Sequence, residues 1–367
     1  MNERIPLFKP FLNVNYATEL VRQTLAIGHI AEGTRVMEFE NALEHLLGAP
    51  VITTNSGTSA IHLALDLAGV GKGDWVVSTP MTCLATNLPI LHRGANIAWA
   101  DVHPTTGLIH AGDVEQLAQF MGAKAIVAVE YGGLPVDYEG LLRASKHAGN
   151  IPIILDAAHS LLTYDEAGAN WAHVDICCYS LQAIKHLTTG DGGALIVPPH
   201  KFEEAKRKRW FGLDRSLGGF RCEQEVTEIG YKFHMNDIAA SIGLANIGSV
   251  EDVVTITREN ASFYHEALKD IPSITLPPNA KGASWWLYTI LVPDRERFVA
   301  KMDERGIQCA RPHSRNDTHP IFRLYHRKLP GVTAFDEHQV AIPVGWWVTP
   351  TIRERIAEAI QEVMKSC

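Results

Sequence analysis

The sequence predicts an α/β protein: a large domain built on a mostly parallel sheet, followed by a smaller α+β domain. Two observations support this class. Over roughly the first two thirds of the 367 residues, short β-rich segments alternate with segments of helical periodicity, which is typical of a parallel sheet covered on both faces. Beyond residue 247 the pattern changes to long helical segments with few strands. We therefore expect a large domain over 1–247, including an N-terminal arm, and a small domain over 248–367.

The large domain is expected to contain seven strands, each a short run rich in apolar or β-branched residues. They lie at 51–54, 75–78, 97–100, 125–131, 152–155, 174–181 and 193–197. Helical periodicity separates several of them, for example over 59–68 and 138–148. Ligands of parallel sheets bind beyond the carboxyl ends of the strands, so the residues just after each strand are the first candidates for a site.

The small domain is expected to begin with a long helix over 249–268. The apolar segment SWWLYTILV follows, then a helix over 294–305, the segment GIQCARP and a final helix from residue 351. Helices with few strands between them are typical of an α+β layout.

Composition limits the classes of partner. The chain is 46% apolar and 20% charged with a net charge of −8, which lacks the basic character of nucleic-acid-binding domains. We interpret its densest basic run, KRKRW at 206–210, as a solvated helix face. No apolar run approaches a membrane span, the first residues lack a signal-peptide core, and the six cysteines have no CxxC spacing. We expect a soluble cytoplasmic protein with no nucleic-acid partner, no membrane and no disulfide framework.

The segment NSGTSAIHLAL places a turn between an apolar strand and an amphipathic helix. Gly57 permits close approach to the backbone, and Thr58 adds a hydroxyl at a helix start whose amides point outward. Such a helix start can bind phosphate. On this motif alone, an ordinary helix cap is the simpler explanation.

Two more strands end in polar residues. The apolar run IPIIL leads directly to Asp156, with His159 three residues later. A carboxylate at that depth needs a cationic partner, unless it only caps the next helix. SLQAIKHLTTGDGG begins at Ser180, where another buried strand ends, and carries Lys185 in a loop that glycines turn back into the sheet. Taken alone, Lys185 is equally well explained as a surface lysine at a corner.

Together the three motifs indicate a pyridoxal phosphate site. This cofactor needs a lysine for its aldehyde, a carboxylate that keeps its pyridine nitrogen protonated, and donors for its phosphate. Lys185, Asp156 and the helix start at Gly57 supply these groups on one parallel sheet.

The chain resembles the DegT/DnrJ/EryC1/StrS family of pyridoxal-phosphate-dependent nucleotide-sugar aminotransferases. The resemblance covers nearly the whole chain, from RIPLFKPFL through TLAIGHIAEGTRVMEFENAL, VITTNSGTSAIHLAL, YGGLPVD, IILDAAHS and YSLQAIKHLTTGDGG to GYKFHMNDIAASIGLANI and GIQCARPH. It implies the type I fold of aspartate aminotransferase, a homodimer, and pyridoxal phosphate that alternates with pyridoxamine phosphate.

The resemblance also implies roles for single residues. Lys185 matches the Schiff-base lysine, Asp156 matches the partner of the pyridine nitrogen, and His159 lies where relatives have Gln or His near the ring hydroxyl. The positions that match phosphate contacts are Gly57, Thr58 and Ser180.

Three positions depart from the family pattern; one is His234, which stands where an Arg often follows and to which we assign no role. Cys83 stands where many relatives stack an aromatic residue on the pyridine ring, so we expect Cys83 to cover less of the ring or another side chain to stack there. In the family's Gly-Tyr-Asn, whose Asn reaches the phosphate of the neighbouring subunit, the third residue is Lys232 here. A lysine can act as a point charge on phosphate, so we expect Lys232 to make this contact in trans.

The seventeen histidines raise the question of a metal. Neither an HExxH motif nor Cys/His ligand spacing is present, so no metal is expected. In the family the RPHSRNDTHPIF segment lies near the substrate entrance, which makes Arg311, His313 and Arg315 candidate contacts for a nucleotide diphosphate. We interpret the tryptophan pairs 285–286 and 346–347 as core or interface residues.

The resemblance therefore implies transfer of an amino group to a nucleotide-linked keto-deoxy sugar, with glutamate as the donor by family precedent and with Lys185 also moving the substrate proton. The short loop after Lys185 favours amination at C4 over C3. The family serves deoxyamino-sugar synthesis for polysaccharides such as O-antigen, or for glycosylated natural products. Two alternatives stay open: a nucleotide-sugar dehydratase on the same fold, which has histidine at the lysine position (His186 is adjacent), and a non-catalytic regulator.

Overall fold

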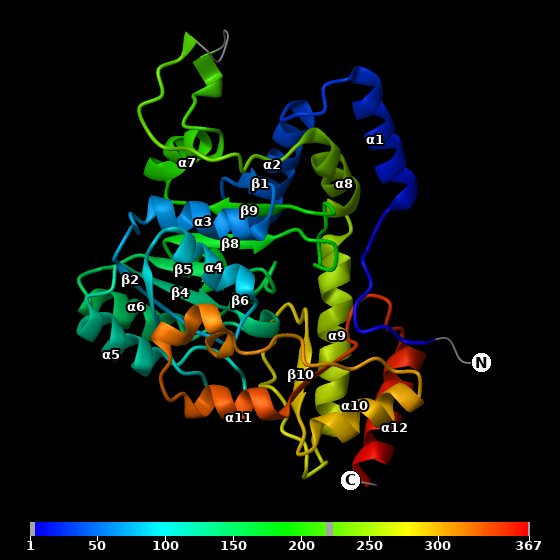
Figure 1. The fold of residues 1–367 in the computed structure, drawn as a ribbon. Coiled ribbons are helices and arrows are strands. Elements are labelled where there is room, and N and C mark those ends of the chain that lie inside the picture. Colours follow the sequence, from blue (N-terminus) through cyan, green and yellow to red (C-terminus); the bar gives the residue numbers. More distant parts are fainter. Residues whose placement is uncertain (1–3, 218–222, 366–367) are drawn as a thin grey trace.

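A seven-stranded sheet forms the centre of the protein (Figure 1). The structure is a computed structural model that describes residues 4–217 and 223–365. The sheet order is β1-β9-β8-β5-β4-β2-β3, and β9 alone among these strands runs antiparallel to its neighbours. The strands are β1 (Ile52–Thr54), β2 (Trp75–Ser78), β3 (Asn96–Trp99), β4 (Ala125–Val129), β5 (Ile153–Asp156), β8 (Ile176–Ser180) and β9 (Gly193–Ile196). The predicted mostly parallel sheet is confirmed.

All seven predicted strands are present, and several are shorter than expected; the one predicted over 174–181, for example, spans Ile176–Ser180. The run predicted over 125–131 ends at Val129, and a 3-10 turn over Tyr131–Gly133 follows. Gly132 and Gly133 have φ values of 70° and 93°, a left-handed backbone that glycine adopts without strain. These two glycines turn the chain away from the sheet edge.

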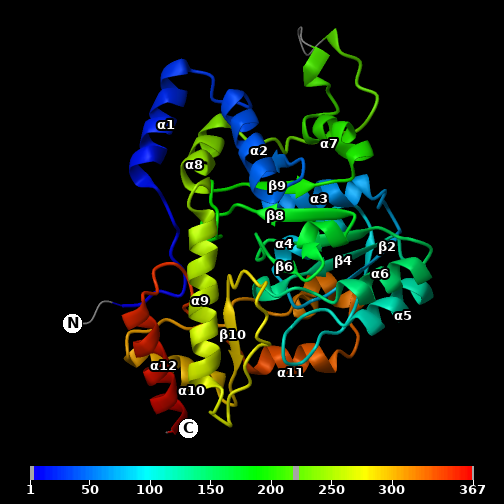
Figure 2. The same cartoon turned by 180° about the vertical axis from the view of Figure 1, so that it is seen from behind.

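Helices cover both faces of the sheet (Figures 1 and 2). On one face, Phe39, Val114 and Leu141 pack with sheet residues such as Ile126. Their helices, with α8 beside them, are α2 (Thr34–Leu47), α5 (Ala111–Met121), α6 (Tyr138–His147) and α8 (Asp237–Ile247). On the other face, helices α3 (Gly57–Leu67), α4 (Leu84–His92) and α7 (Phe202–Arg209) pack against residues such as Val127. Alternate residues of β4 thus point to opposite cores, as expected for a strand buried on both faces.

A separate hydrophobic cluster lies in the C-terminal part of the chain. It joins α9 (Val250–Leu268), α10 (Arg295–Glu304) and α12 (Pro350–Lys365) to a two-stranded antiparallel sheet of β10 (Tyr288–Leu291) and β11 (Gln339–Ile342). Helix α11 (Pro330–His338) instead contributes Phe335 to the large core, and Ile5 of the N-terminal arm joins the C-terminal cluster. The predicted boundary at residue 247 stays a prediction.

The remaining elements are peripheral. Helix α1 (Val14–Ile27) packs on α8, and the short strands β6 (Tyr164–Asp165) and β7 (Gly168–Ala169) form a hairpin. Within the described ranges, no single helix has both the length and the apolar character to cross a membrane. In the same ranges one pair of helices, α8 and α9 with a 58° bend between them, passes on length and composition alone.

Candidate active site

The carboxyl ends of β5 and β8 bring the central predicted residues to one edge of the sheet. These strands are parallel neighbours, with Asp156 the last residue of β5 and Ser180 the last residue of β8. Lys185 lies in the loop that follows β8 and returns to β9. Parallel pairing explains the arrangement, because the ends of such strands meet at the same edge.

Lys185 lies beside Asp156 and Cys83. Burial lowers the pKa of Lys185 to about 7, and electrostatic interactions with Asp156 and Cys83 oppose that shift. The Lys185 Nζ lies 3.4 Å from the centroid of the Trp286 ring. An amine with this pKa is partly neutral near pH 7, so it can act as a nucleophile or as a base.

Asp156 is only 4% exposed and is oriented by two hydrogen bonds. Its Oδ2 accepts a hydrogen bond from Thr86 Oγ1 at 2.6 Å, and its Oδ1 accepts one from the Ala158 amide at 3.0 Å. Burial raises the pKa of Asp156, whereas these two donors and Lys185 lower it. Among the described residues Asp156 forms no salt bridge, so the carboxylate lacks a bonded cation.

The Thr86 hydroxyl is itself part of a buried chain of hydrogen bonds. It lies 2.8 Å from the Thr82 hydroxyl, and the Thr82 carbonyl accepts a hydrogen bond from Asn316 Nδ2 at 2.8 Å. All three side chains are buried. This chain ties the loop that carries Cys83 to Asp156 and to the C-terminal part of the protein.

His159 is a neutral donor at the same edge. Its Nδ1 accepts a hydrogen bond from the Gly132 amide at 3.2 Å, which places the ring proton of the neutral form on Nε2. Burial, together with Lys185, holds the pKa of His159 well below its ordinary value. The ring stacks on Trp286 at 4.0 Å and on His313 at 5.3 Å. Of the predicted site residues, His159 and His313 therefore both lie in the group around Lys185.

The start of α3 lies against the end of β8. Ser56 caps this helix by accepting a hydrogen bond from the Ser59 amide at 3.1 Å. The amides of Gly57 and Thr58 make no hydrogen bond within the described part of the chain. A Cβ atom at Gly57 would lie 3.0 Å from the Ser180 Cβ, so the helix start and Ser180 meet closely. Two unpaired amides and a hydroxyl at one point are suited to an anion.

Two predicted substrate contacts do not join this group. Arg311 is exposed and forms an ion pair with Asp336 at 3.2 Å. Arg315 forms two hydrogen bonds of 2.7 Å with Asp317. Each guanidinium is thus already bound to a carboxylate. Their predicted role toward a diphosphate stays a prediction.

Lys232 lies on a segment beside the α3 start. Its carbonyl accepts a hydrogen bond from Asn55 Nδ2 at 3.2 Å, and the next carbonyl accepts one from the Asn55 amide at 2.7 Å. The Lys232 side chain is exposed, and its Nζ lies 4.5 Å from the centroid of the Trp210 ring. The contact that we predict with a neighbouring subunit stays a prediction.

His186, the neighbour of Lys185, lies near both Lys185 and His159. It is buried, its Nε2 has no hydrogen-bond partner among the described residues, and burial lowers its pKa to about 3. It contacts the Ser284 backbone and is influenced by Arg258. The charge of Asp156 acts on Lys185, so Lys185 is the side chain that faces the strand-end carboxylate.

The structure adds three candidate functional residues that were not predicted from the sequence. Thr86 lies one helical turn after Thr82, a spacing that the sequence displays but does not distinguish from ordinary helix. Trp286, interpreted from the sequence as core or interface, contacts Lys185 and His159. Glu130 follows β4 and is fully buried. It accepts hydrogen bonds from the Tyr138 hydroxyl and from Asn170 Nδ2, and burial raises its pKa to about 7.

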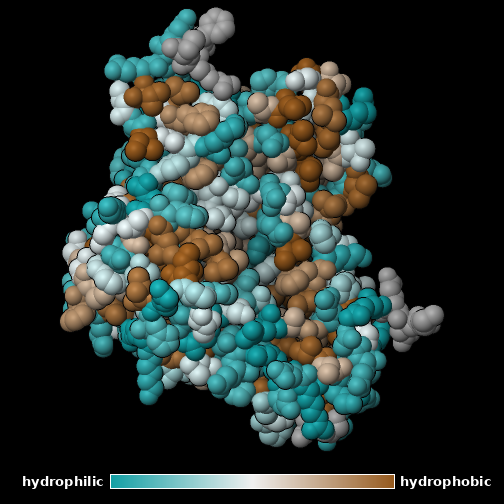
Figure 3. Space-filling view, in the orientation of Figure 1, coloured by the Kyte–Doolittle hydropathy of each residue, from teal (hydrophilic) through white to brown (hydrophobic). Residues whose placement is uncertain are grey.

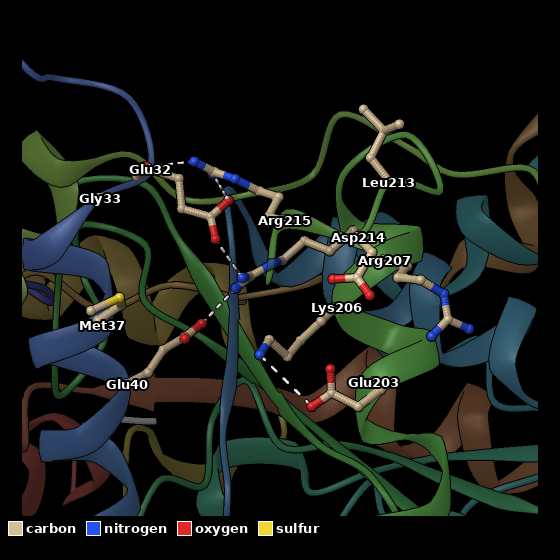
Figure 4. Close-up of a pocket in the computed structure, with 11 residues that line it drawn as sticks. Glu32, Gly33, Met37, Glu40, Glu203, Lys206, Arg207, Leu213, Asp214 and Arg215 are labelled. Atoms are coloured by element: carbon tan, nitrogen blue, oxygen red, sulfur yellow. Dashed lines mark hydrogen bonds and ion pairs between the residues drawn. The ribbon is translucent and has the colours of Figure 1, made fainter. Parts of the chain in front are cut away.

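A separate pocket of about 300 Å³ lies between α2 and α7 (Figure 4). Its charges are largely paired: Arg209 binds Glu32 at 2.6 Å and Glu40 at 2.5 Å, and Arg215 binds Glu32 at 2.9 Å. Arg209 is 3% exposed. The interpretation of the basic run 206–210 as a solvated face is therefore wrong for Arg209, because two carboxylates compensate its charge inside the protein.

Within residues 4–217 and 223–365, no group of three or more His, Cys, Asp or Glu side chains is placed to hold a metal ion. Four cysteines in these ranges are free thiols: Cys83, Cys177, Cys178 and Cys309. Cys222 and Cys367 lie outside the described residues.

Comparisons with known proteins agree on one family and one fold. The model of the DegT/DnrJ/EryC1/StrS aminotransferase family matches residues 14–361. Among solved structures, AtS13 from Actinomadura melliaura is 37% identical with a TM-score of 0.92, covering 98% of this chain and 99% of that one. The sugar aminotransferase CalS13 from Micromonospora echinospora is 34% identical with a TM-score of 0.91, covering 98% and 99%. PseC from Helicobacter pylori, an aminotransferase of pseudoaminic acid biosynthesis, shares the fold at 23% identity, with a TM-score of 0.90 over all of both chains.

Proposed function

The chain belongs to the DegT/DnrJ/EryC1/StrS aminotransferase family of pyridoxal-phosphate-dependent sugar aminotransferases, and we propose that it moves an amino group from glutamate to a nucleotide-linked keto-deoxy sugar. The observation that carries the proposal is the meeting of Lys185, Asp156 and the α3 start at one sheet edge. These are the three groups that the cofactor requires.

The residues at this edge fit pyridoxal phosphate. Asp156 is a buried carboxylate without a bonded cation, which a protonated pyridine nitrogen would supply. The unpaired amides of Gly57 and Thr58, with the Ser180 hydroxyl, offer donors for the phosphate. The Nε2 proton of His159 offers a donor for the ring hydroxyl. When bound, the cofactor supplies an electron sink and carries the amino group between the two substrates.

Lys185 provides the reactive amine in this proposal. Its lowered pKa leaves part of the Nζ neutral near pH 7, as required for attack on an aldehyde and for removal of a proton from carbon. Asp156 lies close enough to oppose this shift, so the pKa values of Lys185 and Asp156 depend on each other. The charge of Asp156 acts on Lys185, which favours the aminotransferase over the dehydratase alternative.

The finer parts of the proposal concern the acceptor and the assembly. We propose amination at C4, a homodimer, and a contact of Lys232 with the neighbouring phosphate site. Apolar side chains exposed on α1 support a self-association surface: Val14 is 63% and Ile27 is 74% exposed, and apolar atoms gather over this region in Figure 3. The contacts of Arg311, His313 and Arg315 with the nucleotide, and the cytoplasmic location, remain predictions.

The test is the absorbance spectrum of the purified protein with pyridoxal phosphate, before and after glutamate is added. We expect a visible absorbance band that disappears when glutamate is added, while 2-oxoglutarate forms. Lys185→Ala should show neither change. Full activity of Lys185→Ala would contradict the assignment. A visible band that does not change on addition of glutamate would support the cofactor assignment and contradict glutamate as the donor.

A further inference from the structure

Trp286 lies on a segment that is fixed to the same elements as His159. This segment leads into β10, and Ser284 anchors it at two points. The Ser284 hydroxyl donates a hydrogen bond to the His159 carbonyl at 3.0 Å, and the Ser284 amide donates one to the Gly133 carbonyl at 3.1 Å. The adjacent Trp285 has a φ of 52°, a left-handed conformation that is strained for a bulky residue. The backbone is thus held in one conformation beside His159.

The indole of Trp286 makes three contacts at once. Its Nε1 donates a hydrogen bond of 2.8 Å to the carbonyl of Ile184, the residue before Lys185. Its ring centroid lies 3.4 Å from the Lys185 Nζ. The same ring stacks on His159 at 4.0 Å with an interplanar angle of 29°. Trp286 is 8% exposed, and Phe8 also stacks on its ring, with centroids 5.2 Å apart.

The contact with Lys185 is electrostatic as well as steric. Among the described residues Lys185 forms no salt bridge, and the electron-rich face of the Trp286 indole lies in direct contact with its Nζ. An aromatic face stabilises an ammonium more than a neutral amine. The hydrogen bond to the Ile184 carbonyl ties the same indole to the backbone next to Lys185.

We propose that Trp286 is a positioning residue that holds the Lys185 amine whenever it is not bonded to the cofactor. The proposal rests on the proposed function for the role of Lys185. It explains why a half-buried lysine stays at the sheet edge without a carboxylate bonded to it. An amine that is not bonded to the cofactor would be held against the indole face, at the sheet edge where Asp156 lies.

The test is the pH dependence of cofactor incorporation into the apoprotein, followed by absorbance between about pH 5.5 and 9. This profile reports the apparent pKa of the Lys185 amine. In Trp286→Leu the ammonium loses the aromatic face, so the profile should shift to lower pH by about one unit. Trp286→Phe keeps a ring but loses the bond to Ile184, so the shift should be under about half a unit.

The matched control is Trp171→Phe. Trp171 also donates its indole Nε1 to a backbone carbonyl, that of Leu47 at 2.9 Å, but it lies outside the Lys185 group. This variant should leave the pH profile unchanged. A merely structural role of Trp286 would lower the melting temperature without moving the profile. Single-turnover measurements with glutamate should show a rate about tenfold lower in Trp286→Leu, with the apparent KM within about twofold.

Each outcome decides the proposal. An apparent pKa in Trp286→Leu equal to that of the wild type overturns it. If Trp286→Leu does not fold, Trp286→Phe carries the test: a half-reaction rate about threefold lower than in Trp171→Phe supports the proposal, and equal rates overturn it. If the wild type binds the cofactor but shows no absorbance change with glutamate, the proposed donor is wrong. The pH profile of cofactor incorporation still decides the role of Trp286.

Discussion

The hydrogen bond from Thr86 to Asp156 should set the affinity of the protein for its cofactor. In Thr86→Val the side chain keeps nearly the same shape but loses the hydroxyl that donates to Asp156 Oδ2 at 2.6 Å. Both side chains are buried, so water cannot easily replace the donor. A hydrogen bond to a charged group contributes about 1.5–3 kcal/mol, which corresponds to a rise of about one to two units in the pKa of Asp156.

A higher pKa weakens the hold of Asp156 on a protonated pyridine nitrogen. The same energy corresponds to roughly 10- to 100-fold weaker binding of pyridoxal phosphate by Thr86→Val. The assay is a titration of the apoprotein with pyridoxal phosphate, followed by absorbance. The control is Thr82→Val, which removes the neighbouring hydroxyl but leaves the donor to Asp156 in place. If Thr86→Val binds the cofactor within twofold of the wild type, the hydroxyl does not support Asp156 and the reasoning fails.

Three further predictions follow from single sites. The rate of cofactor incorporation should rise with pH through about 7 and then level off, because the neutral Lys185 amine is the reactive form; a flat profile would reject the lowered pKa. The pKa of Glu130 is raised to about 7 by burial, so its contribution to stability is fully present below the ordinary value and is lost as pH rises through 7. Relative to Glu130→Gln, the wild type should therefore lose about 2 kcal/mol of unfolding free energy between about pH 5.5 and 8, measured with urea, and equal pH dependence would contradict this. In Gly193→Ala the new Cβ would lie 2.4 Å from the Ser56 carbonyl oxygen, so the start of α3 must move and both melting temperature and cofactor affinity should fall; Gly248→Ala, with open space around it, is the control.

The positions of Asp156, Ser180 and Lys185 could be predicted because they depend on local pattern and on one rule of topology. Short apolar runs identify the strands, and alternation with helices indicates parallel order. Parallel order then places the residues after each strand at a common edge. The strand predicted over 125–131 ends at Val129, before two glycines turn the chain at Gly132 and Gly133.

The tertiary structure alone decided which side chains support those residues. Thr86 is separated from Asp156 by 70 positions in the chain, and Trp286 is separated from Ile184 by 102. It also paired Arg311 with Asp336, which no local pattern indicated. Periodicity reports which face of a strand or helix is apolar, but it carries no information on which distant polar group completes a hydrogen bond. The sequence by itself therefore determined the sheet edge and the groups that chemistry needs there, and only the packing of the two cores determined how they are held.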